Sequence, residues 1–183
     1  MQRLYRQMGH QCSILEDQLL VMEAQDGSRQ AMEQLVGRWQ KRLWQHAFRL
    51  TQDNSASWDV TQAAWYDILR QLRNLHDPAS FKAWAYKITT CRAIDWIKKK
   101  RHVQSLPVET MELLAAKPKP QSEMDELLGQ LDVDKRVVLS LYYFEELSIS
   151  EISEALKIPA GTVKSRLYTA RNELKILWEK ACK

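Results

Sequence analysis

The stretch that decides the fold is Leu147–Leu167, which reads LSISEISEALKIPAGTVKSRL. Ser148 can cap a short helix, and Glu151 three residues later completes a capping box. The segment from Lys157 to Gly161 predicts a turn, after which a second and more basic helix follows. Two helices joined by so short a turn are typical of a helix-turn-helix, the motif that places its second helix in the major groove of DNA.

Apolar residues at helical spacing divide this motif into an inner and an outer face. The predicted inner faces comprise Ile149, Ile152, Leu156, Val163, Leu167, Ala170, Leu174 and Leu177. On the outer face of the second helix we expect Lys164, Ser165, Tyr168 and Arg171. This mixture of cation, hydroxyl and aromatic ring suits base edges and phosphates. The alternative is a pair of amphipathic helices that pack on a neighbour and turn a polar face to water.

The chain upstream of the motif is also helical by its pattern. Residues 13–104 contain almost no Gly or Pro, and two runs recur at helical spacing. These runs are Leu35, Trp39, Leu43 and Ala47, and then Val60, Ala64, Ile68 and Leu72. Breaks are predicted at 51–57 and 74–80, where Pro78 interrupts the helix and Ser80 is expected to cap the next one, over about 81–102.

Several residues of this upstream part are interpreted as structural. Trp39, Trp44, Trp84 and Trp96 lie on largely apolar faces and are expected in the core. Asp95 falls within the apolar arc of its helix and should need a partner, for which Arg92 is the nearest candidate in sequence.

A Pro-punctuated segment divides the chain. Residues 105–122 contain Pro107, Pro118 and Pro120 with little periodicity, which predicts a flexible linker. The fold class is therefore all-α, with two small helical domains. The N-terminal domain is expected over 13–104, and the C-terminal domain, with the helix-turn-helix, over 123–183.

Charge is distributed unevenly along the 183 residues, although the net charge is only +4. Residues 87–104 hold six basic residues and one acid, and residues 157–183 hold seven basic residues and two acids. Residues 123–156, in contrast, hold nine acids and two bases. One basic face per domain would suit a polyanion contacted at two places. The alternative is that each basic run is the solvated C-terminal end of a helix.

Several function classes find no support in the sequence. No window approaches 18 consecutive apolar residues and the first ten residues are polar and basic, so we expect a cytoplasmic protein without membrane insertion. The cysteines at 12, 91 and 182 show no CxxC spacing, which predicts neither a disulfide framework nor a zinc site. No catalytic constellation and no cofactor are predicted.

The motifs together resemble the extracytoplasmic-function (ECF) group of bacterial RNA polymerase sigma factors. In the C-terminal half the resemblance rests on Leu131-x-x-x-Lys135-Arg136-x-Val138-Leu139, Glu146-Leu147-Ser148-x-x-Glu151-Ile152 and Gly161-Thr162-Val163-Lys164-Ser165-Arg166-Leu167-x-x-Ala170-Arg171. In the N-terminal half it rests on Asp26-Gly27-Ser28, Asp59-Val60-x-Gln62-x-x-Trp65, Ser80-Phe81-x-Ala83-Trp84 and Asp95-Trp96. It covers about residues 20–175 in the family's order.

The resemblance implies a division of roles. The −35 promoter element would be read by Lys164, Ser165, Arg166, Tyr168 and Arg171. The −10 element would be opened and captured by Asn74, His76, Asp77, Ser80, Cys91, Lys98, Lys99, Lys100 and Arg101. Core RNA polymerase would be contacted by Asp59, Gln62 and Trp65. The implied partners are this core enzyme, through its β′ clamp helices and β flap, promoter DNA and an anti-sigma factor.

Two positions depart from the family pattern, and two other functions compete with it. Trp58 stands where the family usually has Glu, and Cys91 stands where it often has Asn, so Cys91 is expected either in the capture pocket or in the core. A stand-alone helix-turn-helix regulator would bind its operator without polymerase. A recombinase with a DNA-binding domain would need a Ser-Arg or Tyr-Arg constellation, and we find none in the N-terminal half.

Overall fold

The computed structural model describes residues 2–104 and 122–181, and all regular structure in these ranges is helical. The N-terminal unit consists of α1 (Gln2–Gln25), α2 (Arg29–Thr51), α3 (Asn54–Gln71), the 3₁₀ turns η1 (Leu72–Asn74) and η2 (Pro78–Ser80), and α4 (Phe81–Gln104). The C-terminal unit consists of α5 (Glu123–Gly129), α6 (Val133–Leu139), the π turn η3 (Ser140–Phe144), α7 (Ile149–Leu156) and α8 (Ala160–Ala181). The predicted all-α class is confirmed, whereas the predicted linker lies outside the described residues except for Ser122.

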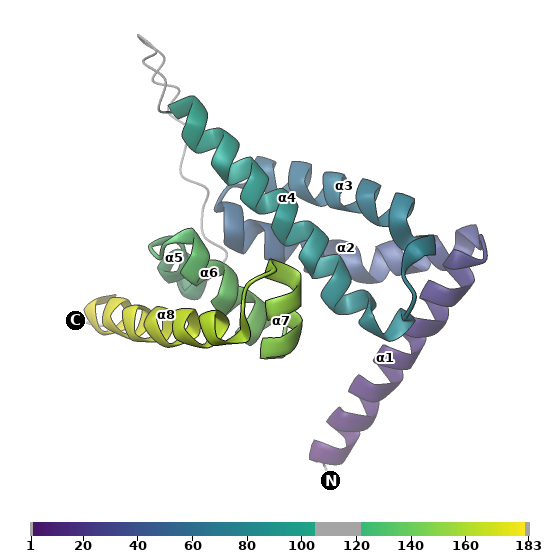
Figure 1. The fold of residues 1–183 in the computed structure, drawn as a ribbon. Helices are drawn as coiled ribbons and strands as arrows, with labels where there is room; N and C mark the ends of the chain where they lie inside the picture. The colour runs from purple at the N-terminus through teal and green to yellow at the C-terminus, as the bar shows by residue number, and fades with distance from the viewer. Residues whose placement is uncertain (1, 105–121, 182–183) are drawn as a thin grey trace.

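The two units pack against each other rather than standing apart. Helices α2, α3 and α4 form a bundle, and α1 packs against α2 at one end of it, with its N-terminal half projecting away from the bundle (Figure 1). The C-terminal helices lie below α4 in this view, where α7 contacts α4 and the segments α5, α6 and η3 contact α2. A sequence pattern specifies which face of a helix is apolar, but not which other unit covers a polar face, so this docking was not predicted.

Helix starts follow the capping residues of the sequence. The Asp53 carboxylate accepts from the backbone N–H of Ala56 at 3.1 Å, and Ser148 with Glu151 forms the predicted capping box at the start of α7. The predicted cap at Ser80 is wrong. Its hydroxyl lies inside the η2 turn and donates to the Asp77 carbonyl at 2.7 Å, because Asp77 has already capped that turn.

An aromatic cluster forms the centre of the N-terminal core. Trp39 is 2% exposed and packs edge-to-face on Phe81 and Tyr86, with ring centroids 5.2 and 5.8 Å away. Trp44 is buried as expected, but Trp84 and Trp96 are only partly buried. The first turns of α4 are therefore fixed against α2, which sets the position of the loop before them.

The predicted pairing of Asp95 with Arg92 is wrong. Asp95 is exposed and needs no partner, since it lies at the edge of α4 that faces water. Arg92 instead reaches across to α3, where its guanidinium forms an ion pair with Asp67 at 2.5 Å. Proximity in sequence was a poor guide here, because neighbouring helices offer closer partners than the same helix.

The helix-turn-helix forms as predicted, with a shorter turn. Ile152, Val163 and Leu167 are buried to 1% exposure or less, whereas Leu174 is only partly buried. The turn between α7 and α8 is Lys157–Pro159, because α8 begins at Ala160.

An unpredicted π turn precedes the motif. Over Ser140–Phe144 the helix widens, and the N–H of Glu145 donates to the carbonyl of Ser140 five residues earlier at 3.2 Å. The chain then leaves the helix through Glu146, whose φ of 53° lies in the left-handed region. This geometry turns Glu145 inward, toward α2.

Lys157 provides a test of local strain. It caps α7 with φ 53°, a left-handed conformation that is costly for a residue with a Cβ atom, and its side chain is exposed. We expect Lys157→Gly to raise the free energy of unfolding by about 0.5–1 kcal/mol. Urea denaturation followed by circular dichroism would measure the gain. Lys157→Ala removes the same side chain without relieving the backbone, so an equal gain in that variant would contradict this explanation.

Candidate nucleic-acid interface

The outer face of α8 presents the residues predicted for base reading. Lys164, Ser165 and Tyr168 are exposed, Tyr168 at 65%. The Ser165 hydroxyl donates to the carbonyl of Thr162 at 3.0 Å, which leaves its oxygen lone pairs toward solvent. The arrangement is a protruding helix whose polar side chains can enter a groove.

The two arginines of α8 are held by local contacts. Arg166 is partly buried and forms an ion pair with Asp134 of α6 at 2.8 Å. The Nε of Arg171 donates to the carbonyl of Leu167 at 3.1 Å, while the rest of the side chain is exposed. Arg166 therefore braces α8 against α6, and Arg171 keeps free guanidinium nitrogens for a phosphate.

The loop before α4 borders a cavity of about 360 Å³. The part of its lining that comes from the N-terminal unit comprises Gln71, Asn74, Leu75, His76, Asp77, Ser80, Ala83, Trp84 and Lys87. The structure thus brings together four of the residues predicted for −10 capture. Trp84, which was interpreted as core, instead offers part of its indole to this cavity.

Cys91 lies outside this cavity, one turn further along α4. It follows Lys87 by four residues and is exposed, so the expectation of a core position is wrong. The exposure follows from the packing of α4, whose buried face passes through Thr90 and Ala93 rather than Cys91.

The basic run at the end of α4 is open to solvent. Lys98, Lys99, Lys100 and Arg101 are all exposed. The Lys100 ammonium lies 4.7 Å from the centre of the Trp96 ring and 3.3 Å from the Asp53 carboxylate, which positions it along the helix. On the same helix, this run follows Lys87, the last α4 residue that lines the cavity, by 11 to 14 residues.

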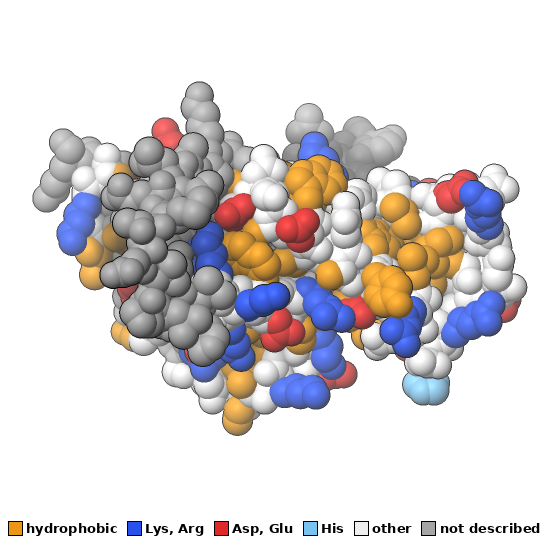
Figure 2. All heavy atoms as spheres, turned by 90° about the horizontal axis from the view of Figure 1, so that it is seen from above, with side chains coloured by type: hydrophobic (Ala, Val, Ile, Leu, Met, Phe, Trp, Pro, Cys, Tyr) orange, Lys and Arg blue, Asp and Glu red, His pale blue; other side chains and the backbone are white. Residues whose placement is uncertain are grey.

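A mixed acidic and apolar surface lies along α3. Asp59 and Gln62 are exposed on it together with Trp58, Tyr66 and Leu69, which are 45–60% exposed. Figure 2, which views the molecule from above, shows exposed hydrophobic side chains among Lys and Arg side chains. Trp65, predicted with Asp59 and Gln62, is instead 6% exposed and packs in the core. Trp65 follows Gln62 by three residues, but the rotation of the helix between them turns the Trp65 side chain toward the core. The spacing of three residues alone did not indicate this difference.

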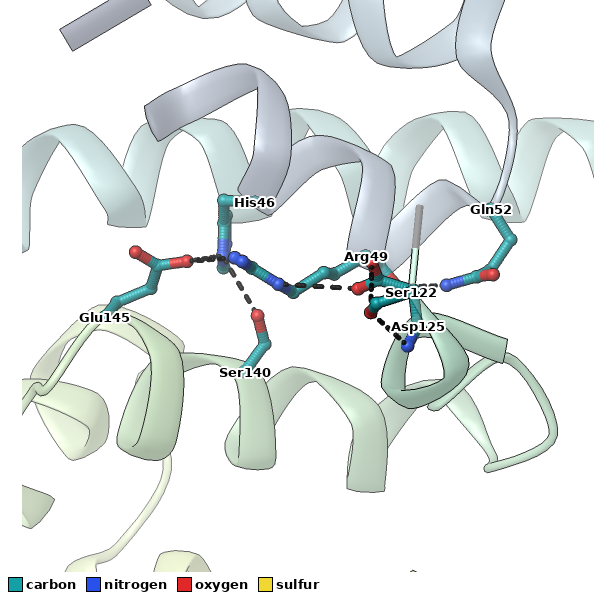
Figure 3. Close-up of polar contacts among 7 residues, drawn as sticks. All are labelled: His46, Arg49, Gln52, Ser122, Asp125, Ser140 and Glu145. Atoms are coloured by element: carbon teal, nitrogen blue, oxygen red, sulfur yellow. Dashed lines mark hydrogen bonds and ion pairs between the residues drawn. The ribbon is translucent and has the colours of Figure 1, made fainter. Parts of the chain in front are cut away.

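A buried polar cluster joins the two units, and no pattern in the sequence predicted it (Figure 3). Glu145 of the C-terminal unit is 5% exposed, and its carboxylate lies 2.9 Å from Arg49 Nη1 and 3.3 Å from His46 Nδ1. His46 is fully buried and also contacts Ser140 Oγ at 3.2 Å and Thr90 Oγ1 at 2.8 Å. Helical periodicity could not predict this cluster, because its residues come from α2 and from the C-terminal unit, which are far apart in the sequence.

The cluster keeps the Glu145 carboxylate charged. Burial alone would raise its pKa, but the hydrogen bond and charge of His46, the hydrogen bond of Tyr86 and the charge of Arg49 together lower it below the ordinary value. Burial, with the negative charge of Glu145 beside it, raises the pKa of Tyr86, which stays a neutral donor. The cluster is therefore an ionic contact at neutral pH, shielded from solvent.

The described residues were also searched for a metal site and for a membrane-spanning helix. Within residues 2–104 and 122–181 no group of three or more His, Cys, Asp or Glu side chains is placed to hold a metal ion. Among the helices of the same ranges, none is long and apolar enough to cross a bilayer.

Comparison with known proteins accounts for both units. Residues 35–103 match the model of Sigma-70 region 2, and residues 121–174 match that of Sigma-70 region 4. The RNA polymerase sigma-H factor of Pseudomonas aeruginosa is 27% identical over 87% of this chain and 92% of its own length. The probable RNA polymerase sigma factor RfaY of Xanthomonas campestris is 33% identical over 81% of this chain, which spans only 41% of that longer protein.

The fold is shared with two solved structures. The sigma factor RpoE of Bartonella quintana, solved in complex with the anti-sigma factor NepR, superimposes with a TM-score of 0.67 over 81% of this chain and 96% of that chain, at 21% identity. CnrH, in a structure with the cytosolic domain of CnrY, superimposes with a TM-score of 0.66 over 90% of this chain and 98% of that chain, at 23% identity. Both matched regions occur here in the family's order, each on one of the two helical units. The ECF sigma factor SigW of Bacillus subtilis and the ECF sigma-E factor of Escherichia coli match along 92% and 93% of their own lengths. The chain belongs to the sigma-70 family, as a member of its ECF group of RNA polymerase sigma factors.

Proposed function

We propose that this chain binds core RNA polymerase and directs promoter-specific initiation of transcription, as an alternative sigma factor. The observation that carries the proposal is the presence of two surfaces suited to DNA on one chain. One is the exposed face of α8 with Lys164 and Tyr168, and the other is the cavity and basic run of α4. A protruding basic helix suits the duplex −35 element, and a cavity beside a cationic run suits an unstacked base with its phosphates.

Each partner corresponds to a separate surface in this proposal. Asp59 and Gln62 on α3 would contact the β′ clamp helices, with Tyr66 and Leu69 supplying apolar area, and the C-terminal unit would contact the β flap. An anti-sigma factor would regulate the chain, since the sigma factor RpoE, which shares this fold, was solved in complex with the anti-sigma factor NepR. The sigma factor family is not a class of enzymes, so the chain would act by binding alone, in the cytoplasm.

Transcription in vitro with purified core polymerase tests the proposal. Adding the chain to core enzyme and a promoter library should start RNA at defined sites that core enzyme alone does not use. A stand-alone regulator would instead bind its operator without polymerase and leave the start sites unchanged. Absence of new start sites, with core enzyme that responds to another sigma factor, would overturn the proposal.

Base reading by α8 predicts a position-specific loss. Because Lys164 is exposed on the outer face, Lys164→Ala should cost about 1–3 kcal/mol at a particular −35 base pair and little at others. Transcription from a promoter library with every −35 position varied would measure it. Lys175→Ala is the matched control, since Lys175 lies further along α8 and pairs with Glu179 at 3.8 Å. A changed preference only at the −10 end would contradict the assignment.

A further inference from the structure

The loop that borders the α4 cavity is hydrogen-bonded to α1. Within the described ranges, the side-chain hydrogen bonds that reach residues 72–77 from another helix both come from Gln25. Its Nε2 donates to the carbonyl of Leu72 at 2.9 Å and to the carbonyl of Leu75 at 2.7 Å, 47 and 50 residues further along the chain. Because both partners are carbonyl oxygens, these contacts use both N–H groups of the carboxamide.

The two carbonyls lie where the chain leaves η1 for the loop. This short 3₁₀ turn ends with one backbone hydrogen bond, from the Leu75 N–H to the Leu72 carbonyl at 3.0 Å. Leu72 is buried and Leu75 is partly buried against the core. The neighbouring side chains of Asn74, His76 and Asp77 are exposed and line the cavity. Holding the backbone at Leu72 and Leu75 therefore fixes the direction in which these exposed side chains project.

Helix α1 is itself fixed to the bundle. It contacts both η1 and η2, the two turns on either side of the loop. The Arg38 guanidinium of α2 forms ion pairs with Asp17 of α1 at 2.7 Å and with Glu16 at 2.8 Å, and it donates to the Ser13 hydroxyl at 3.0 Å. Helix α1 is therefore a rigid support for the loop, although it precedes the part of the chain that matches Sigma-70 region 2.

We propose that Gln25 is a positioning residue for recognition of the −10 element. Its carboxamide holds the loop backbone in the shape that accepts an unstacked base, so less ordering is required when DNA binds. Gln25 touches no base and acts through the Leu72 and Leu75 carbonyls. The inference rests on the proposed function for the identity of the ligand, whereas the effect of Gln25 on the loop is a property of the free chain.

Three substitutions separate the hydrogen bonds of Gln25 from its bulk. Gln25→Leu removes the donors, Gln25→Glu keeps the shape but offers only acceptors to the two carbonyls, and Gln25→Lys restores donors on a side chain of similar reach. In hydrogen–deuterium exchange of the full chain, residues 72–77 should exchange about tenfold faster in the first two variants, because two hydrogen bonds no longer oppose local opening. Gln25→Lys should return the exchange rate to within about twofold of that of the unaltered chain.

The second measurement is one that a merely structural role would not change. Holoenzyme assembled with each variant transcribes a promoter library in which every −10 and −35 position is varied. Gln25→Leu and Gln25→Glu should lower the preference for the favoured −10 bases by about tenfold, and Gln25→Lys should restore it. The −35 preference and the affinity for core enzyme should stay unchanged in all three variants.

Gln18→Leu is the matched control. Gln18 lies on the same helix, is half-buried and has no hydrogen bond to the loop among the described residues, so its variant should leave both the exchange and the −10 preference unchanged. Should Gln25→Leu fold poorly by circular dichroism, Gln25→Glu and Gln25→Lys provide the comparison.

The outcomes that would overturn the proposal differ from those that concern the proposed function. Unchanged loop exchange in Gln25→Leu and Gln25→Glu, faster exchange with the −10 preference intact, or no rescue by Gln25→Lys would each remove Gln25 from this role. Failure of the unaltered chain to direct transcription would overturn the proposed function, whereas exchange in the free chain would still show whether Gln25 holds the loop.

Discussion

Replacing Asp59 with arginine is expected to weaken binding to core RNA polymerase by at least about tenfold. The side chain is exposed on α3 beside Gln62 and Tyr66, so the change reverses a charge at the centre of the proposed contact surface. Placing a like charge across an interface costs on the order of a few kcal/mol, and each 1.4 kcal/mol is about a factor of ten in affinity. Surface plasmon resonance with immobilised core enzyme would measure the loss.

The matched control reverses a charge elsewhere on the same unit. Glu23 is exposed on α1, away from α3, so Glu23→Arg should bind core enzyme nearly as well as the unaltered chain. Circular dichroism should show that both variants keep their helices. Equal affinity of the Asp59 and Glu23 variants would remove Asp59 from the polymerase-binding surface.

The largest loss of stability is expected from Trp39→Ala. The indole is 2% exposed and supports both Phe81 and Tyr86 at the start of α4. Truncation leaves a cavity that rigid helices cannot fill, and should lower the free energy of unfolding by about 3–5 kcal/mol. Urea denaturation of the full chain, followed by near-ultraviolet circular dichroism, would measure the change in the N-terminal unit.

The matching control uses an exposed tryptophan. Trp178 on α8 is 45% exposed, so Trp178→Ala removes the same number of atoms with little burial to lose, and should cost well under about 1 kcal/mol. Similar losses in the two variants would show that Trp39 is not the packing centre of the N-terminal unit.

Local features of this fold could be predicted because they depend on residues a few positions apart. The capping box of Ser148 and Glu151 needs only a spacing of three, and the buried stripe through Val163 and Leu167 needs only the helical period. The outer face of α8 is then the face opposite this buried stripe. The same reasoning placed Asp59 and Gln62 on the exposed face of α3.

The remaining features depend on contacts between distant segments. Arg92 pairs with Asp67 of another helix, and Glu145 is buried only because α2 of the other unit covers it. A period of 3.6 also does not distinguish a large side chain at the boundary of a face, so Trp65 was placed on the surface and Trp84 in the core. In each case the missing information is which neighbour covers the residue.

The π turn over Ser140–Phe144 makes the length of this segment as important as its composition. A π turn accommodates one residue more than an α-helix would over the same rise. Deleting a single residue between Ser140 and Phe144 would restore a regular helix and rotate the downstream chain by about 100°. Glu145 would then point away from His46, although every remaining residue would be unchanged. In this family member, insertions and deletions here should be tolerated far less than substitutions of the exposed Tyr142 and Tyr143.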